Sequence, residues 1–350
     1  MLYPLLFKPV YKEMIWGGSK LRDHYGREIP SGHTGESWDI TCRREEMGVI
    51  ENGADAGMTF ADWIGREKSE ALGTRCTTSA ENFPLLIKII DAQDNLSVQV
   101  HPDDGYEYGV AGKNELWYIM EPPKDGELIV GLKDGVTREA FERAINSGEA
   151  EALLYRLPVK SGDIVNIPAG LVHALTKGTV VAEIQQNSNI TYRMFDYNRV
   201  GADGKPRELH IARALAVTDF ARRIPRKTAE GLGIKKDGAR LSYVAANRHF
   251  AVVKYQLDSS SVENADPSAF CVFTCVKGEA SVISNGGSIK TEIPLSRSVL
   301  IPAHLGKYEL RGNGVLVKSF VPDIENDFMK PLREAGYADT IIREHTAIYV

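Results

Sequence analysis

The sequence predicts a mainly β protein, built from short and mostly antiparallel strands that form barrels or sandwiches. Runs rich in Val, Ile, Leu, Tyr and Phe recur over residues 85–200 and again over 240–320, separated by Gly, Pro, Asn and Asp. The chain has 350 residues, of which 43% are hydrophobic and 25% charged, as in globular proteins that bury a core. We therefore expect an N-terminal β domain over 1–215 and a C-terminal one over 216–350.

Six apolar runs in the first group have the length and composition of strands, and turn residues bound them. They are FPLLIKII (83–90), LSVQVHP (96–102), ELWYIM (115–120), ELIVGL (127–132), DIVNIPAG (163–170) and TVVAEIQ (179–185).

Helical patterns interrupt the N-terminal half at two places. Over residues 59–73, Thr59 and Asp62 have the spacing of a capping box, and apolar residues recur on one face until Gly73. Over residues 137–157 the pattern predicts one helix that stops at Gly148 and a second, short helix after it. We interpret both segments as helical insertions between strands.

The second half of the chain repeats a short phrase of the first. IPAHLGKYEL at 301–310 echoes IPAGLVHALT at 167–176, and in this alignment His173 becomes Lys307. Duplication of a β unit and chance are both open explanations for so short a match. If the unit is duplicated, the second copy has lost its histidine, and its role is expected to be structural.

Composition and charge argue against several function classes. The net charge of −5 leaves no basic stripe for a phosphate backbone, so we expect no nucleic-acid partner. No run of about 18 apolar residues predicts a membrane span, and no export signal is evident, so we expect a cytoplasmic protein. Cys271 and Cys275 would share one strand face as buried core thiols, and we expect all cysteines to be reduced.

The run LSVQVHP carries polar side chains where an ordinary half-buried strand would be bland. Ser97, Gln99 and His101 are two residues apart, so they share one face, while Val98 and Val100 share the other. Solvent exposure explains such a face in most strands. Other chemical motifs nearby in the sequence favour a functional reading.

Two further motifs supply partners for this polar face. Lys113 and Glu115 begin a strongly apolar strand after a loop that can bring that strand back beside the first. In IPAGLVHAL, Pro168 and Gly170 form a tight turn that delivers His173 to the start of the next strand.

Two imidazoles and two oxygen ligands suit a divalent metal, zinc if the chemistry is redox-silent, with iron or manganese also acceptable. The ordered set is Gln99, His101, Glu115 and His173.

The run TVVAEIQQNSNITYR adds two charged groups. Glu183 shares a strand face with Val181 and Gln185, so it can point where His173 points. Arg193 follows ten residues later. Surface pairing is the bland alternative, but an arginine beside a metal cavity can hold a phosphate or developing negative charge.

These motifs resemble type I mannose-6-phosphate isomerase in its short bacterial form, a family of the cupin superfamily. Six stretches match in order between about residues 30 and 200: GESWDI, FPLLIKII, LSVQVHPDD, GKNELWY, IPAGLVHAL and EIQQNSNITYR. The resemblance implies two cupin-like (jelly-roll) β-barrel units with helical insertions in the N-terminal half. The first would be catalytic and metal-binding, and the second a degenerate cupin-like domain.

The resemblance also implies residue roles. It gives a metal site of Gln99, His101, Glu115 and His173, in which the two histidines and the glutamate form the firmer core. It implies that Lys88 and Ser97 bind the phosphate or sugar, and that Lys113, Glu183 and Arg193 are catalytic. Either Glu183 or Lys113 is the general base, and the sequence does not choose between them. Trp16, Glu36 and Trp38 also match and are interpreted as structural.

The implied function is interconversion of mannose 6-phosphate and fructose 6-phosphate through a cis-enediol(ate). One divalent ion per chain, Zn²⁺ or alternatively Fe²⁺ or Mn²⁺, would act as a Lewis acid. A non-enzymatic sugar-phosphate-binding or storage cupin and an iron-dependent cupin dioxygenase are the rival functions. The expected partner is a small sugar phosphate, and the chain is expected to be a monomer or homodimer.

One position departs from the family pattern. Many relatives have an aspartate four residues before the arginine, whereas this sequence has Asn189. An amide cannot act as a base or stabilise a charged histidine as a carboxylate does. The departure therefore predicts slower turnover or an altered substrate preference, if that aspartate acts with the metal histidine.

Overall fold

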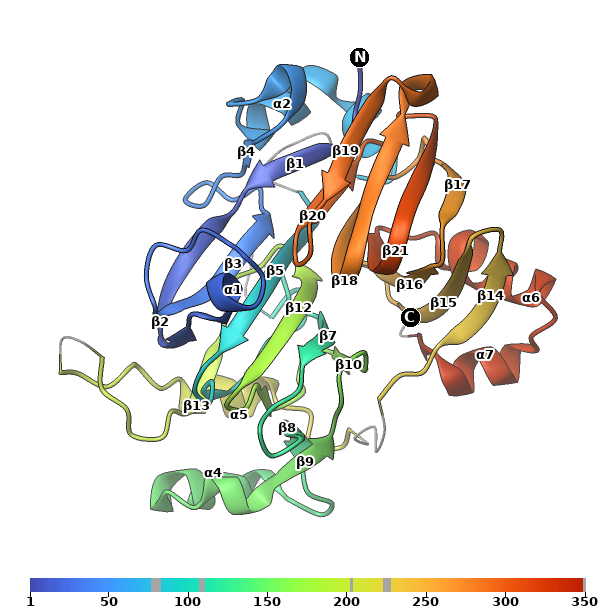
Figure 1. Ribbon diagram of the computed structural model, residues 1–350. Coiled ribbons are helices and arrows are strands. Elements are labelled where there is room, and N and C mark those ends of the chain that lie inside the picture. The colour runs from blue at the N-terminus through green and yellow to red at the C-terminus, as the bar shows by residue number, and fades with distance from the viewer. Residues whose placement is uncertain (77–82, 107–110, 202–203, 223–227, 349–350) are drawn as a thin grey trace. The chain divides into compact units, whose positions relative to one another are not determined.

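The computed structural model describes residues 1–76, 83–106, 111–201, 204–222 and 228–348 (Figure 1). The chain divides into two compact units, each assembled from segments that are distant in sequence. The terminal unit consists of residues 1–10, 38–88 and 229–350, and the central unit consists of residues 11–37 and 89–228. The sequence predicts two contiguous domains that meet between residues 215 and 216. These units are not contiguous in sequence, so that boundary stays a prediction.

The central unit holds most of the strands of two sheets, and the terminal unit includes part of β3 and β5. The five-stranded sheet has the order β13 (Tyr192–Phe195), β6 (Val98–Val100), β11 (His173–Ala174), β8 (Glu127–Leu132) and β9 (Leu154–Pro158). The six-stranded sheet has the order β10 (Ile164–Ile167), β7 (Glu115–Glu121), β12 (Thr179–Gln186), β5 (Leu85–Ala92), β3 (Thr34–Ile40) and β2 (Val10–Gly18). All six predicted strands are present, because their alternating or continuous apolar residues are buried in these sheets.

The predicted helical insertions are partly correct. Helix α2 (Phe60–Glu67) begins after Thr59, whose hydroxyl accepts a hydrogen bond from the Asp62 amide as a capping residue does. Lys68, with a positive φ of 53°, separates it from α3 (Ser69–Leu72). Helix α4 (Arg138–Ser147) stops at Gly148 in the left-handed conformation, as predicted.

The second short helix is wrong in its last residues. A 3₁₀ turn, η3 (Ala150–Leu153), leads directly into strand β9, which pairs with β8. Leu154 and Leu157 are buried on this strand, so pairing with a neighbouring strand outweighs the local helical pattern.

The central unit also contains α1 (Lys20–Asp23) and α5 (Ile211–Val217), whereas α2 and α3 belong to the terminal unit. No helix within the described ranges is long and apolar enough to cross a membrane.

The terminal unit is built on one eleven-stranded sheet. Its main path runs β14 (Leu232–Lys236), β15 (Ala239–Ala246), β16 (Ala251–Leu257), β21 (Lys307–Phe320), β18 (Cys271–Ser284), β20 (Ser298–Ile301), β1 (Leu5–Lys8) and β4 (Val49–Ile50). Off this path are β17 (Ser260–Asn264), β19 (Ile289–Ile293) and β22 (Ala347–Ile348). Near the C-terminus follow the π-helix η5 (Ile324–Met329), α6 (Lys330–Glu334) and α7 (Asp339–His345). Short 3₁₀ turns are η1 (Gly53–Asp55) and η4 (Asn285–Gly287).

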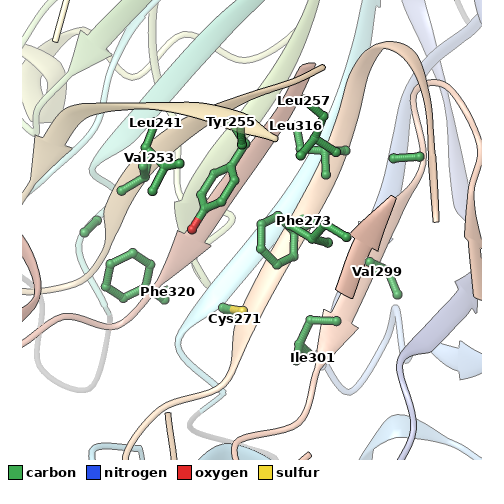
Figure 2. Close-up of a cluster of buried hydrophobic side chains, with 14 of the residues drawn as sticks. Leu241, Val253, Tyr255, Leu257, Cys271, Phe273, Val299, Ile301, Leu316 and Phe320 are labelled. Carbon is green, nitrogen blue, oxygen red and sulfur yellow. The ribbon is translucent and has the colours of Figure 1, made fainter. Parts of the chain in front are cut away.

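The core of the terminal unit lies between the curved strands of this sheet. Figure 2 shows part of it, with Tyr255, Phe273 and Phe320 among the buried side chains. Cys271 and Cys275 lie on the same strand, β18, and both belong to this core, as predicted for structural thiols.

The mainly β, jelly-roll-like prediction is confirmed, but the barrels are not closed. Closure requires the two end strands of a sheet to pair with each other. In the described residues the path of the large sheet starts at β14 and ends at β4, and the two smaller sheets are open as well. The units are therefore curved, open jelly-roll-like sheets.

The repeated phrase occupies equivalent positions in the two units. Strand β10 ends at Ile167 and β11 begins at His173, while β20 ends at Ile301 and β21 begins at Lys307. The aligned residues thus mark the same strand–turn–strand boundaries, which supports duplication over chance.

Candidate metal centre

Three neighbouring strands of the five-stranded sheet place polar side chains in one row. Gln99 on β6 lies opposite Arg193 of β13 on one side and His173 of β11 on the other. Side chains directly opposite each other across strands share a face of the sheet. The alternation in LSVQVHP therefore does present Gln99 beside two other predicted site residues.

The turn before His173 is fixed to the strand that carries His101. Gly170 has a φ of 83°, and its amide donates a hydrogen bond to the His101 carbonyl at 2.9 Å. A Cβ at this position would lie 3.2 Å from the Val217 carbonyl oxygen. Both the positive φ and this close packing therefore favour glycine. The predicted Pro-x-Gly turn thus holds the two histidines in a common frame.

Three buried ligand atoms converge at this point. His101 Nε2 lies 3.2 Å from His173 Nε2 and 3.3 Å from Glu115 Oε1, while Glu115 Oε2 lies 3.7 Å from His173 Nε2. The side chains of all three residues are 1% exposed. In the described part of the chain Glu115 Oε2 has no hydrogen-bond partner, although it is buried. An unsatisfied carboxylate oxygen beside two imidazole nitrogens fits a cation.

The protonation states agree with a metal-binding role. Burial, reinforced by the charge of Lys113, lowers the pKa of His101 to about 3, and burial also lowers the pKa of His173. Burial alone would raise the pKa of Glu115, but the charge of Lys113 is the largest of the effects that outweigh it and hold the pKa well below its usual range. Neutral imidazoles and an ionised carboxylate are the forms that bind a metal.

The orientation of His173 is set by its second nitrogen. Nδ1 lies 2.8 Å from the Leu171 carbonyl oxygen, to which it can only donate. The Nε2 lone pair therefore points toward His101 and Glu115, an arrangement common among histidine ligands of metals. Gln99 Nε2 lies 3.4 Å from the same His173 nitrogen, so the glutamine borders the cluster as a fourth polar group.

Lys113 is part of the same buried cluster. Its ammonium donates to Glu115 Oε1 and lies 3.1 Å from His101 Nε2. The two-residue spacing of Lys113 and Glu115 at the start of β7 thus brings both groups to the ligand cluster. The ammonium supplies positive charge next to the only carboxylate of the triad.

Sequence reasoning missed Trp117, which connects Glu183 to the ligand cluster. Glu183 on β12 lies directly opposite Trp117 on β7, and the indole N–H donates to Glu183 Oε2 at 2.9 Å. The Trp117 ring lies 5.4 Å from the ring of His173, centroid to centroid. The signal was present in ELWYIM, where Trp117 is two residues after Glu115 and so shares its face.

Arg193 lies at the other end of the row and is held by neutral acceptors. Its Nε donates to the Ser97 hydroxyl at 3.3 Å, and one terminal nitrogen donates to the Glu208 carbonyl at 2.8 Å. The nearby carboxylate of Asp196 is bound by Arg199 and Arg207 instead. The guanidinium thus keeps its charge beside Gln99 without a carboxylate hydrogen bond in these contacts.

Two sequence-predicted positions are not among the hydrogen-bond and ion-pair contacts of this cluster. Lys88 is buried in the terminal unit, where its ammonium lies 4.9 Å from the Trp38 ring centroid, so its predicted phosphate contact stays a prediction. Asn189 is exposed, whereas the polar contacts of His101 are made by Lys113, His173 and Glu115. Among these contacts none joins Asn189 to His101, and the expected effect of Asn189 on turnover stays a prediction.

Two family models match the chain. "Phosphomannose isomerase type I, catalytic domain" covers residues 5–143, and "Mannose-6-phosphate isomerase, cupin domain" covers residues 239–321. A protein of Bacillus subtilis named "Probable mannose-6-phosphate isomerase GmuF" is 38% identical over 319 residues, which are 89% of this chain and 97% of the relative. The chain belongs to the type I mannose-6-phosphate isomerase family. Mannose-6-phosphate isomerase ManA of the same organism is also 38% identical, over 88% of this chain and 96% of that protein.

Solved structures agree with this family assignment. The crystal structure of a mannose 6-phosphate isomerase from Bacillus subtilis matches with a TM-score of 0.81 and 31% identity, over 91% of this chain and 99% of that chain. A mutant phosphomannose isomerase from Salmonella typhimurium matches with a TM-score of 0.72 over 91% of this chain and 100% of that chain. At 16% identity this second likeness supports a shared fold alone.

The ligand cluster predicts a loss of metal on substitution. His173→Ala should weaken Zn²⁺ binding by more than about a hundredfold, since even outer partners of metal ligands contribute about ten- to a hundredfold. The measurement is metal content after dialysis against a Zn²⁺ buffer series. His33→Ala, which changes an exposed histidine, is the matched control and should bind as wild type. Equal Zn²⁺ content in both variants would contradict the assignment.

Proposed function

We propose that this sugar-phosphate isomerase interconverts mannose 6-phosphate and fructose 6-phosphate through a cis-enediol(ate). The observation that carries the proposal is the convergence of His101, Glu115 and His173. Of these, His173 also lies in one cross-strand row with Gln99 and Arg193. The relatives' names add the substrate.

The proposed metal ligands are His101, Glu115 and His173, with Gln99 as a fourth. When bound, a divalent ion would act as a Lewis acid toward the carbonyl and hydroxyl oxygens of the open-chain sugar. Zn²⁺ is the proposed ion because the reaction moves a proton and no electrons, while Fe²⁺ and Mn²⁺ accept the same ligands. The proposed substrate ligands are Ser97 and Lys88.

Glu183 is the proposed general base. An aldose–ketose exchange through an enediol removes a proton from C2 and returns it to C1, so one group has to accept and then donate it. The Glu183 carboxylate is buried, and Trp117 orients it through a hydrogen bond. Lys113 Nζ, in contrast, donates to Glu115, and a lysine in an ion pair is a poor proton acceptor. Lys113 is therefore proposed to supply positive charge and a hydrogen bond.

Arg193 is proposed to stabilise the enediolate oxygen. Its guanidinium stays protonated, and neighbouring Arg199 and Arg207 engage Asp196, which would otherwise compete for it. Adjacent strands are about 4.8 Å apart, so Arg193 and His173, two strands apart, can face opposite ends of a single hexose.

The proposal is tested by a coupled assay with mannose 6-phosphate. We expect turnover by the purified chain, loss of turnover after treatment with a chelator, and recovery when Zn²⁺ is added back. Parallel restoration with Fe²⁺ and Mn²⁺ identifies the best ion. Turnover that is unaffected by removal of all bound metal would refute metal dependence, and absence of turnover with the metal-loaded protein would refute the function.

Replacement of Arg193 should slow the chemical step. If it resembles the loss of one preorganised oxyanion donor, Arg193→Ala costs about 3 kcal/mol, or on the order of a hundredfold in kcat. Steady-state kinetics with mannose 6-phosphate provide the measurement, and Arg138→Ala, at the exposed start of α4, is the control. A kcat within about twofold of wild type would exclude this role.

Replacement of Lys88 should affect binding more than chemistry. An ammonium hydrogen-bonded to a phosphate contributes about 1.5–3 kcal/mol, so Lys88→Ala should raise KM about tenfold or more. The kcat should change little, because a remote phosphate contact is made equally in the ground and transition states. Lys8→Ala, which removes an exposed lysine at the end of β1, is the control. The reverse pattern, a large drop in kcat at constant KM, would contradict phosphate binding.

A further inference from the structure

A lysine occupies a core-facing position on a central strand of the terminal unit. Leu316 and Phe320 lie two residues before and after Lys318 on β21, and both belong to the buried cluster shown in Figure 2. Side chains two apart on a strand share a face, so Lys318 also points toward this core. Its cross-strand partners, Val253 and Phe273, belong to the same cluster. Lys318 thus stands where its neighbours are apolar.

The Lys318 ammonium has no polar partner among the residues that the structure describes. Its contacts there are with aromatic rings: Nζ lies 5.1 Å from the centroid of Phe320 and 6.0 Å from that of Phe273. Such rings attract a cation, but an ammonium that is partly removed from water remains costly unless an anion pairs with it. The position therefore lacks a structural reason within the chain.

A cavity of about 270 Å³ adjoins Lys318. Val253, Phe270 and Ile301 contribute apolar walls, and Tyr255 and Cys271 line it as well. Figure 2 shows the Tyr255 hydroxyl directed toward the region of Cys271 and Phe320. Burial, followed by the charge of Glu263, raises the pKa of Tyr255 well above its usual value, so the hydroxyl stays protonated and donates its hydrogen bond to Glu263. The volume corresponds to roughly nine waters, enough for a small organic molecule.

The carboxylates around this cavity already have cations. Asp266 and Asp327 line it, and Arg75 forms ion pairs with both. In an adjoining hollow, which Lys318 also lines, Lys236 binds the carboxylate of Glu263 at 2.6 Å. Each of these carboxylates is held by Arg75 or Lys236, and none of them forms a direct ion pair with Lys318 in the described residues.

We propose that the terminal unit binds a small organic anion, with its carboxylate or phosphate group on Lys318 and its apolar body in the adjoining cavity. The pocket would be separate in composition from the metal centre, since it contains none of the metal ligands or proposed catalytic residues. A unit whose lost histidine suggested a purely structural role would then carry a second ligand site.

Isothermal titration of the full-length chain tests this proposal with three probes of similar shape: benzoate, phenyl phosphate and neutral benzyl alcohol. We expect at least one anion to bind more tightly than the alcohol, and the preferred anion distinguishes a carboxylate from a phosphate ligand. Lys318→Met should weaken that binding at least about tenfold, as expected for loss of a charged hydrogen bond. Lys318→Arg should retain it.

Two control variants separate this pocket from other anion sites. Lys307→Met removes an exposed lysine from the same strand, and Arg193→Ala alters the metal centre, so both should bind the anion as wild type does. Lys318→Met should melt at the same or a higher temperature without ligand, because it removes an unpaired charge from a core face. The proposal fails if neither anion binds better than benzyl alcohol, if Lys318→Met binds normally, or if Arg193→Ala abolishes the binding.

Discussion

The site depends on burying one carboxylate and two neutral imidazoles at one point. Their acceptor atoms outnumber the hydrogen-bond donors there, and Glu115 Oε2 has no donor in the described residues. His101 and His173 come from the five-stranded sheet and Glu115 from the six-stranded sheet, so their contact requires both sheets of the central unit. Flexible side chains could escape such a desolvated cluster, but these are fixed at strand ends. The Gly170 amide ties the turn of one histidine to the backbone of the other. Folding thus assembles a buried, incompletely hydrogen-bonded set of ligand atoms for which a divalent cation is a natural complement.

The part of this site that the sequence could predict is the part set by local geometry. The period of two in LSVQVHP brings Gln99 to the face of His173, and Pro168 with Gly170 fixes the turn. Contacts that depend on strand order could not be predicted. The Trp117–Glu183 hydrogen bond requires β7 and β12 to be neighbours in a particular register, which no local pattern determines. For the same reason Leu154–Leu157 forms a strand rather than the predicted helix, because the edge of β8 was available to pair with it.

Two further arginines, Arg199 and Arg207, lie near Arg193 and bind the carboxylate of Asp196. Asp196 is buried, and burial alone would raise its pKa, but hydrogen bonds from Arg207 and Arg199 outweigh this and hold the pKa below its usual value. The carboxylate is therefore ionised, and its charge is used by those two arginines. Burial and the charge of Arg207 in turn lower the pKa of Arg193. An arginine in this state is poorly solvated by its own protein and gains more from an anionic oxygen than a surface arginine would.

The repeated strand–turn–strand segment is followed by different ionisable side chains in the two units. In the central unit the second strand begins with His173, whose neutral ring lies in the buried cluster with His101 and Glu115. In the terminal unit it begins with exposed Lys307, and eleven residues later the same strand turns Lys318 toward an apolar core. Loss of the histidine removes the reason for a cation site, yet a core freed of that constraint could have been filled with apolar side chains at lower cost. Retention of an unpaired ammonium beside a cavity is understandable when an anion from outside the chain completes the pair.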